Sequence, residues 1–221
     1  MRAVIFDLDG TLVDTVYAHA LAWWRVLREA DLPVAAWKVH RLIGMSGGLI
    51  TQAAAHEIGR DLSPDETERL QKRHGELYKA LLPDRQPLPG AVALLKHLRD
   101  AKIKHGIATS GKRQDAQPSL EALDLPADMV VIDRTAVERA KPEPDLFLAC
   151  QEKLGVPPDQ CYVVGDAVWD VLAARRAGML AVGLLSGGYG EQELAQAGAY
   201  RVYPDPQHLL DSIYQLGLRP S

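Results

Sequence analysis

The sequence VIFDLDGT occupies residues 4–11 and decides the fold class. Three apolar residues run directly into two aspartates, Asp7 and Asp9, which are followed by Gly10. An apolar run without polar alternation is typical of a strand that is buried on both faces, as in a parallel sheet. Residues two apart in an extended chain point to the same side, so both carboxylates are expected there, at the carboxyl end of a strand. Gly10 permits the tight turn that exposes them.

Short apolar runs alternate with stretches of helical period along most of the chain. The strands predicted in this way are residues 3–6, 107–108, 129–132, 162–164 and 180–185. Such alternation is typical of βαβ units, which build a parallel sheet with helices on both faces. We therefore expect an α/β fold with a doubly wound parallel sheet, in which a ligand binds at the carboxyl ends of the strands.

Residues 16–83 interrupt this rhythm, because they show helical periodicity and no convincing strand. One helix face is formed by apolar residues three or four apart, namely Val16, Ala20, Trp23, Leu27 and Ala30. A second long helix is predicted to begin at Ser63-Pro64, where Ser63 is the N-cap and Glu66 completes a capping box. We expect a helical cap at 16–83, inserted into an α/β core made of residues 1–15 and 84–221.

The composition excludes several classes of protein. The chain has 221 residues, of which 47% are hydrophobic and 24% charged, and its net charge is -4, as expected for a globular protein with a sizeable core. A mildly acidic chain offers no clustered cations for nucleic acid or for an anionic membrane. Neither a signal peptide nor an apolar run of the ~18 residues that a membrane helix needs is evident. We expect a cytoplasmic protein, whose oligomeric state the sequence does not indicate.

Two carboxylates as close as those of Asp7 and Asp9 repel each other unless a cation or a proton lies between them. Mg²⁺ fits such a site, because it is a hard ion that prefers oxygen ligands and also binds phosphate. The structural alternative is a helix N-cap beside a solvated turn acid, which leaves the pairing of acids at a strand end unexplained. The pair therefore indicates a magnesium site.

Residues 7–15, DLDGTLVDT, resemble the first motif of the haloacid dehalogenase superfamily, a group dominated by Mg²⁺-dependent phosphatases with a Rossmann-like core. Three further motifs of that family follow in order and span nearly the whole chain. The resemblance implies that Asp7 is the nucleophile and forms an aspartyl-phosphate. It also implies that Asp9 protonates the leaving alkoxide and then activates water, with Mg²⁺ as the cofactor and a small phosphorylated metabolite as the substrate.

The second motif of the family is matched by IATSGK at residues 107–112. The resemblance implies that Thr109 donates its hydroxyl hydrogen to a phosphoryl oxygen. Backbone N–H groups around Ser110 and Gly111 would help to form a nest that binds the anion. A turn residue or helix N-cap is the ordinary alternative for such a threonine.

The third motif is matched by KPEPDLF at residues 141–147, which resembles the family's KPxPxxF segment. Two prolines stiffen the backbone beside Lys141. By resemblance, its ammonium group is aimed at the charge that Asp7 shares with the transferring phosphoryl group. A solvated loop lysine is the structural alternative.

The fourth motif is matched by VVGDAVWD at residues 163–170. By resemblance Asp166 binds Mg²⁺ directly, and Asp170, one helical turn beyond, holds Lys141 or a metal-bound water. The predicted metal-binding residues are Asp7, Asp9, Asp166 and Asp170. Many relatives carry Ser or Thr where this chain has Ala167, and we interpret Trp169 mainly as a packing residue.

Residues 184–190, LLSGGYG, form a second glycine-rich stretch. Their spacing does not match the G-x-G-x-x-G pattern of a dinucleotide loop. We expect a loop that closes the edge of the core after the last βαβ unit.

Residues in and near the predicted cap indicate which reaction of the family the chain catalyses. His19 stands where β-phosphoglucomutases carry a cap histidine, and both a substrate-binding and a structural role remain open for it. Gly47 lies in the segment where such a mutase carries an arginine, no lysine for a Schiff base occurs from there to Lys72, and Asp9 argues against a dehalogenase. We expect a phosphatase for a small phosphate monoester of the phosphoglycolate or sugar-phosphate class. A β-phosphoglucomutase-like phosphomutase and a non-catalytic binding module are the alternatives.

Overall fold

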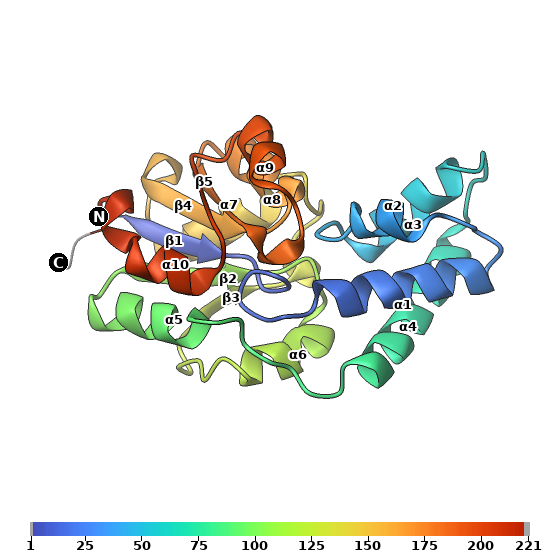
Figure 1. Cartoon of the computed structure of the whole chain (residues 1–221), viewed down its shortest axis with the longest axis horizontal. Coiled ribbons are helices and arrows are strands. Elements are labelled where there is room, and N and C mark those ends of the chain that lie inside the picture. Colours follow the sequence, from blue (N-terminus) through green and yellow to red (C-terminus); the bar gives the residue numbers. More distant parts are fainter. Residues whose placement is uncertain (1, 219–221) are drawn as a thin grey trace.

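The computed structural model describes residues 2–218, and its centre is a six-stranded parallel sheet with the strand order β3-β2-β1-β4-β5-β6 (Figure 1). The central strand β1 (Ala3–Phe6) lies between β2 (Lys104–Ala108) and β4 (Cys161–Gly165). The outer strands are β3 (Val130–Ile132), β5 (Leu180–Leu184) and β6 (Arg201–Tyr203). The predicted α/β fold with a doubly wound parallel sheet is confirmed.

Helices cover both faces of this sheet because alternate residues of β1 enter different cores. Val4 and Phe6 pack with side chains of α5 (Ala91–Asp100), α6 (Arg113–Glu121) and α10 (Pro206–Asp211). Ala3 and Ile5 pack with α7 (Asp145–Leu154), α8 (Val168–Arg176) and α9 (Glu191–Ala197). The short 3-10 helices are η1 (Arg134–Ala136), η2 (Pro158–Gln160), η3 (Leu185–Gly187) and η4 (Ile213–Leu216). Strand β1 is thus buried on both faces, as its apolar run indicated.

The sixth strand corrects one expectation. Residues 184–190 do not follow the last βαβ unit, because α9 and then β6 come after them and β6 pairs in parallel with β5. The sequence hid this unit because β6 has three residues, of which Arg201 is exposed. The glycine-rich loop therefore lies at the carboxyl end of β5, on the edge of the sheet where ligands bind in this fold class.

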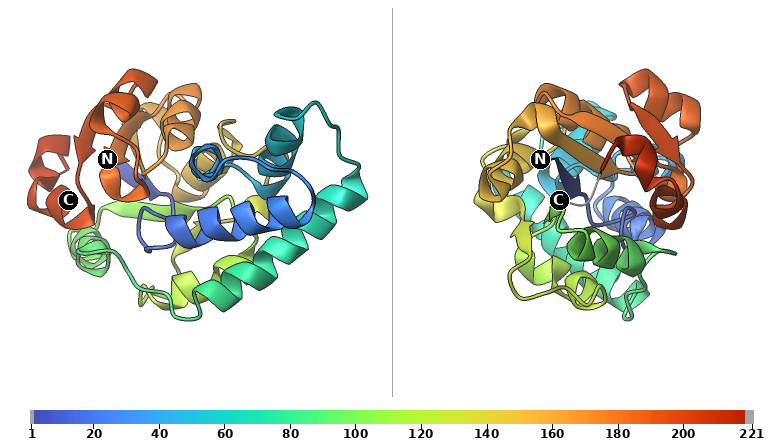
Figure 2. Two further views of the ribbon diagram at one scale, coloured as in Figure 1. Left: turned by 45° about the vertical axis from the view of Figure 1, so that its right-hand side comes forward. Right: turned by 90° about the vertical axis from the view of Figure 1, so that its left-hand side faces the viewer.

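Four helices, which we call the cap, lie beside the carboxyl edge of the sheet (Figure 2). They are α1 (Val16–Glu29), α2 (Ala36–His40), α3 (Gly47–His56) and α4 (Pro64–Leu81), and they share their own apolar core. The predicted start of α4 is confirmed, because Ser63 Oγ accepts from the backbone N–H of Glu66 at 3.2 Å and Ser63 donates its own N–H to Glu66 Oε2 at 3.0 Å. The exact residues that divide cap from core stay a prediction.

Two chain segments join the cap to the core side by side. The N–H of Asp14 donates to the carbonyl of Gln86 at 3.0 Å, and the N–H of Leu88 donates to the carbonyl of Leu12 at 2.9 Å. Among the helices within residues 2–218, none has the length and apolar character that a membrane crossing requires.

Candidate active site

Asp7 stands at the point where the central strand ends. Its N–H donates to the carbonyl of Val164 at 2.9 Å, so the hydrogen bonding between β1 and β4 extends to this residue. The chain then turns at Gly10, whose φ of +85° is a conformation that favours glycine. A Cβ at Gly10 would overlap Val16 and crowd the Asp166 carboxylate, so the turn needs glycine for space as well as for conformation.

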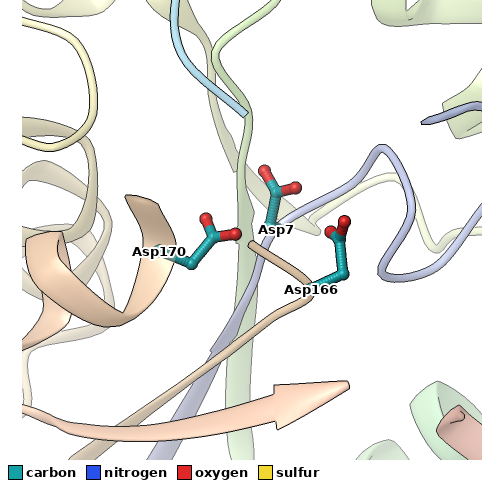
Figure 3. Close-up of side chains that lie close together, drawn as sticks. All are labelled: Asp7, Asp166 and Asp170. Carbon is teal, nitrogen blue, oxygen red and sulfur yellow. The ribbon is translucent and has the colours of Figure 1, made fainter. Parts of the chain in front are cut away.

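Three carboxylates gather at this edge of the sheet (Figure 3). They belong to Asp7 at the end of β1, Asp166 directly after β4, and Asp170 in the first turn of α8, and each offers an oxygen within 4.8 Å of the others. All three residues are at most 4% exposed. Thr11 Oγ1 donates to Asp166 Oδ1 at 2.8 Å and fixes that side chain. We call these three aspartates the acidic cluster.

Lys141 is the cation beside the acidic cluster. Its side chain is fully buried, and its Nζ contacts Asp7 Oδ1 and lies 2.8 Å from Asp170 Oδ1. Burial alone would lower the pKa of Lys141, but the charges of Asp170 and Asp7 outweigh burial and raise it. The lysine therefore stays protonated and joins two of the three acids.

One lysine does not balance three buried carboxylates. Burial raises the pKa of Asp7 to about 7 against the opposing effect of Lys141, and burial with repulsion from Asp170 and Asp7 raises the pKa of Asp166 well above its usual range. The cluster as it stands favours a proton or a second cation. Three carboxylate oxygens in reach of one another are hard ligands, which suit Mg²⁺.

Asp9 faces the cap instead of the acidic cluster. Its Oδ1 accepts from Thr15 Oγ1 at 2.8 Å and lies 3.6 Å from His19 Nε2. Strand β1 ends at Phe6 and Asp9 already lies in the turn at Gly10, so the alternation of an extended strand does not hold for its side chain. The structure thus brings together three of the four predicted metal-binding carboxylates and places the fourth elsewhere.

The environment of Asp9 also differs electrostatically from that of Asp7. Burial acts to raise the pKa of Asp9, but the hydrogen bond and charge of His19, with the hydrogen bond from Thr15, outweigh burial and lower it. Asp9 is therefore ionised near neutral pH, whereas the pKa of Asp7 is raised to about 7. Two carboxylates whose environments shift their pKa values in opposite directions are suited to different roles.

His19 belongs to a stack of rings that the sequence did not reveal. Its ring lies 3.7 Å from the ring of Tyr78 between centroids, and its Nδ1 is 3.1 Å from Nε2 of His74. His74 in turn stacks on Trp23 with centroids 4.1 Å apart, and burial first and then the charge of His19 lower the pKa of His74 well below its usual value. His19 thus packs structurally and reaches Asp9 at the same time. The four-residue spacing of His74 and Tyr78 on α4 was the available signal.

The second motif lies at the end of β2, as expected, and the side chains of Thr109 and Ser110 both form hydrogen bonds there. Thr109 is buried, and its Oγ1 accepts from the N–H of Gly111 at 3.1 Å, which leaves the hydroxyl hydrogen to donate. Ser110 Oγ donates to the carbonyl of Gly44 in the cap at 3.0 Å. The N–H of Gly111 is therefore paired inside the turn, and the side chain of Ser110 contacts the cap. The nest of backbone N–H groups around these residues stays a prediction.

A cavity of about 820 Å³ separates cap from core above these residues. The core contributes Asp7, Asp9, Thr109, Ser110 and Gly111 to its wall, and the cap contributes His19, Trp23, Gln71, Lys72 and His74. Lys141 is fully buried behind Asp7 and touches the acidic cluster. Asp7 therefore connects the cavity with the acidic cluster.

A parallel α/β core with buried acids at its carboxyl edge, closed by a helical cap, defines a class of capped α/β hydrolases. The chain belongs to the family of haloacid dehalogenase-like hydrolases, which matches residues 1–178. The resemblance seen in the four motifs is thereby confirmed, and with it the expectation of an enzyme.

Relatives cover most of the chain. Phosphoglycolate phosphatase of Rhodospirillum rubrum is 37% identical over 215 residues, which are 92% of this chain and 87% of that protein. Beta-phosphoglucomutase of Bacillus subtilis is 34% identical over 193 residues, which are 85% of this chain and 84% of that protein. Among solved structures, a hydrolase from Pseudomonas syringae is 46% identical and superposes with a TM-score of 0.94 over 97% of this chain and 99% of its own.

Proposed function

We propose that the protein is a Mg²⁺-dependent phosphatase that hydrolyses a small phosphate monoester of the phosphoglycolate or sugar-phosphate class through an aspartyl-phosphate on Asp7. One observation carries the proposal: within the described residues, Asp7 is the member of the acidic cluster that also lines the cavity. An ester bound in the cavity can therefore approach this carboxylate. Relatives that are named as phosphatases agree with this function.

The chemistry follows from the positions of the two acids. A carboxylate oxygen of Asp7 attacks phosphorus, and the bond between phosphorus and the ester oxygen breaks. Because Asp9 at the cavity wall is ionised near neutral pH in the free protein, it must first take a proton from solvent when the ester binds, and it then gives this proton to the leaving alkoxide. Asp9 then takes a proton from the water that attacks the phosphorus of the aspartyl-phosphate, which returns Asp7 and releases phosphate.

The surrounding groups make this attack feasible. The hydroxyl of Thr109 is placed at the cavity wall to donate to a phosphoryl oxygen, and Lys141 offsets charge behind Asp7. Asp7, Asp166 and Asp170 would hold Mg²⁺, because their buried oxygens lie within 4.8 Å of one another. The ion supplies charge neutralisation that lets an anionic nucleophile approach an anionic ester.

A phosphomutase is the second candidate. The contact between His19 and Asp9 favours it, because the resemblance places His19 where β-phosphoglucomutases carry a cap histidine. The start of α3 argues against it. A Cβ at Gly47 would lie 3.0 Å from Gln71 Cγ and 3.0 Å from Trp23 Cζ2, so an arginine there would require repacking of both side chains. Phosphate release therefore has the stronger support.

The test is release of inorganic phosphate from an aryl phosphate, with and without Mg²⁺, followed by a panel of phosphorylated metabolites. We expect release that requires Mg²⁺ and favours one class of the panel. Appearance of an isomeric phosphate in place of free phosphate would establish the mutase instead. A chain that binds no Mg²⁺ in calorimetry and releases no phosphate would point to the binding module.

A further inference from the structure

Residues 40–44 of the cap, which we call the clasp, lie on the core. The carbonyl oxygen of Arg41 accepts two hydrogen bonds from core side chains, from Trp169 Nε1 at 2.9 Å and from Tyr189 Oη at 2.8 Å. The guanidinium of Arg41 lies 4.5 Å from the centroid of the Tyr189 ring and 3.0 Å from Glu193 Oε1. In Figure 1 the chain between α2 and α3 lies beside the loop that follows β5.

The clasp reaches the acidic cluster through backbone on two sides of Asp166. His40 Nε2 donates to the carbonyl of Gly187 at 2.8 Å, and Gly187 packs so closely on Asp166 that a Cβ there would overlap Asp166 Oδ2. On the other side, a Cβ at Gly44 would lie 3.0 Å from the Cβ of Ala167. The segment that carries Asp166 thus lies between two residues linked to the cap. Gly187 accepts a hydrogen bond from His40 of the cap, and Gly44 is itself a cap residue.

We propose that His40 and Arg41 are positioning residues: through the loop at Gly187 and Tyr189 they fix Asp166, so closure of the cap and binding of a divalent cation at the acidic cluster are coupled. This inference rests on the proposed function, which places the cation there. Coupling is reciprocal, so a cation that binds more tightly to the closed form also favours closure by the same factor.

The hydrogen bonds to carbonyl oxygens carry this coupling more than the ion pair does. The side chains of Arg41 and Glu193 are 38% and 43% exposed, and ion pairs in that setting contribute little. Tyr189 is 6% exposed, and loss of its hydroxyl would remove one of the two hydrogen bonds that the Arg41 carbonyl accepts from core side chains. The contact between clasp and core therefore depends on individual hydrogen-bond donors, and removal of a single donor atom should weaken it.

Two substitutions remove these donors and keep the rings. Tyr189→Phe loses the bond to the Arg41 carbonyl, and His40→Phe loses the bond to the Gly187 carbonyl while a ring remains to stack on Tyr17. Tyr203→Phe is the matched control, because Tyr203 is a buried tyrosine whose hydroxyl donates to Gln215 within the core. Circular dichroism and thermal melts verify that each variant is folded.

Titration calorimetry with MgCl₂ alone and small-angle scattering on the same samples test the proposal. We expect the double variant to bind Mg²⁺ about fivefold more weakly or worse, and to show a larger radius of gyration in Mg²⁺ than the wild type, with Tyr203→Phe unchanged in both. Either change without the other, or neither, overturns the coupling. A second result is a wild type that binds Mg²⁺ and hydrolyses aryl phosphate, with variants of the same Mg²⁺ affinity and radius of gyration. That result overturns the proposed role of the clasp and leaves the proposed function intact. A wild type without Mg²⁺ binding overturns both.

Discussion

Asp9 Oδ1 lies 3.6 Å from His19 Nε2, so the second aspartate of the first motif faces a histidine of the cap. The first aspartate, Asp7, instead contacts Lys141 in the core. Burial raises the pKa of Asp7 to about 7, whereas the interactions with His19 and Thr15 more than offset burial at Asp9 and lower its pKa. Two acids that are neighbours in sequence therefore lie in separate environments, one in the core and one between core and cap.

These environments predict that Asp7→Asn and Asp9→Asn differ in kind. Asp7→Asn should abolish transfer of phosphate to the protein, because an amide is a poor nucleophile. Asp9→Asn should still form phosphoenzyme from an aryl phosphate, whose leaving group needs little protonation, and should hydrolyse it ~10²–10⁴-fold more slowly. Quench-flow with labelled substrate measures both steps. Undiminished turnover in Asp7→Asn would refute the assignment of the nucleophile.

Features that depend on neighbouring residues in the chain were predictable. The apolar run at residues 3–6 became the central strand, and the capping box of Ser63 and Glu66 starts α4. Strand β6 escaped prediction because its two apolar residues, Val202 and Tyr203, follow the exposed Arg201 and form too short an apolar run to indicate a strand. Its position comes from pairing with β5, which is a tertiary effect.

For the candidate active site, too, some features were predictable from the sequence and others were not. Motif order placed Asp7, Lys141, Asp166 and Asp170 at one sheet edge, because the ends of parallel strands meet there. The direction of Asp9, the partner His74 and the clasp depend on how the cap packs on the core, and no local pattern encodes that packing. The one local hint of the clasp was its glycine-rich counterpart at residues 184–190, where glycine allows close approach to Asp166.

Stability of the metal-free protein should depend on pH through Asp7. Its pKa is 3.8 before burial and about 7 in the folded chain, so the folded state binds the extra proton between these values. The contribution is fully present below about pH 4 and is lost as the pH rises through 7. In EDTA, the free energy of unfolding of the wild type should therefore decrease relative to that of Asp7→Asn when the pH is raised from 5 to 8. Urea denaturation at both pH values measures it, and a constant difference would contradict the raised pKa.

Added Mg²⁺ should stabilise the acidic cluster at a pH where the proton on Asp7 has been lost. At pH 8 the melting temperature of the wild type should rise with Mg²⁺ concentration, because a cation that binds only the folded state stabilises it by mass action. Asp166→Asn should show a smaller rise, since it removes one anionic oxygen of the acidic cluster. Thermal melts across a Mg²⁺ series give the comparison, with Na⁺ at matched ionic strength as the control. Equal rises in both proteins would remove Asp166 from the cation site.

Lys141→Met should destabilise the metal-free protein by about 3–5 kcal/mol at pH 8, because it leaves Asp7 and Asp170 as buried charges without their partner. The loss should be smaller at pH 5, because Asp7, whose pKa is raised to about 7, is then protonated. Lys96→Met is the control, since Lys96 pairs with Asp100 on an exposed helix face, and a change of only about 0.5 kcal/mol is expected there. Urea denaturation in EDTA measures both variants. Equal losses at the two pH values would mean that packing, and not charge, is what Lys141 supplies.

Gly187→Ala should weaken Mg²⁺ binding while the fold survives. A Cβ at this position would overlap the carboxylate of Asp166, which must then turn or shift away from Asp7 and Asp170. Gly75→Ala is the matched control, because a Cβ there meets nothing within 4 Å and alanine should stabilise the interior of α4 by about 0.5–1 kcal/mol. Calorimetry with MgCl₂ and thermal melts separate the two effects. Wild-type Mg²⁺ affinity in Gly187→Ala would show that the loop after β5 can move without disturbing Asp166, and would thereby also weaken the link between the clasp and the acidic cluster.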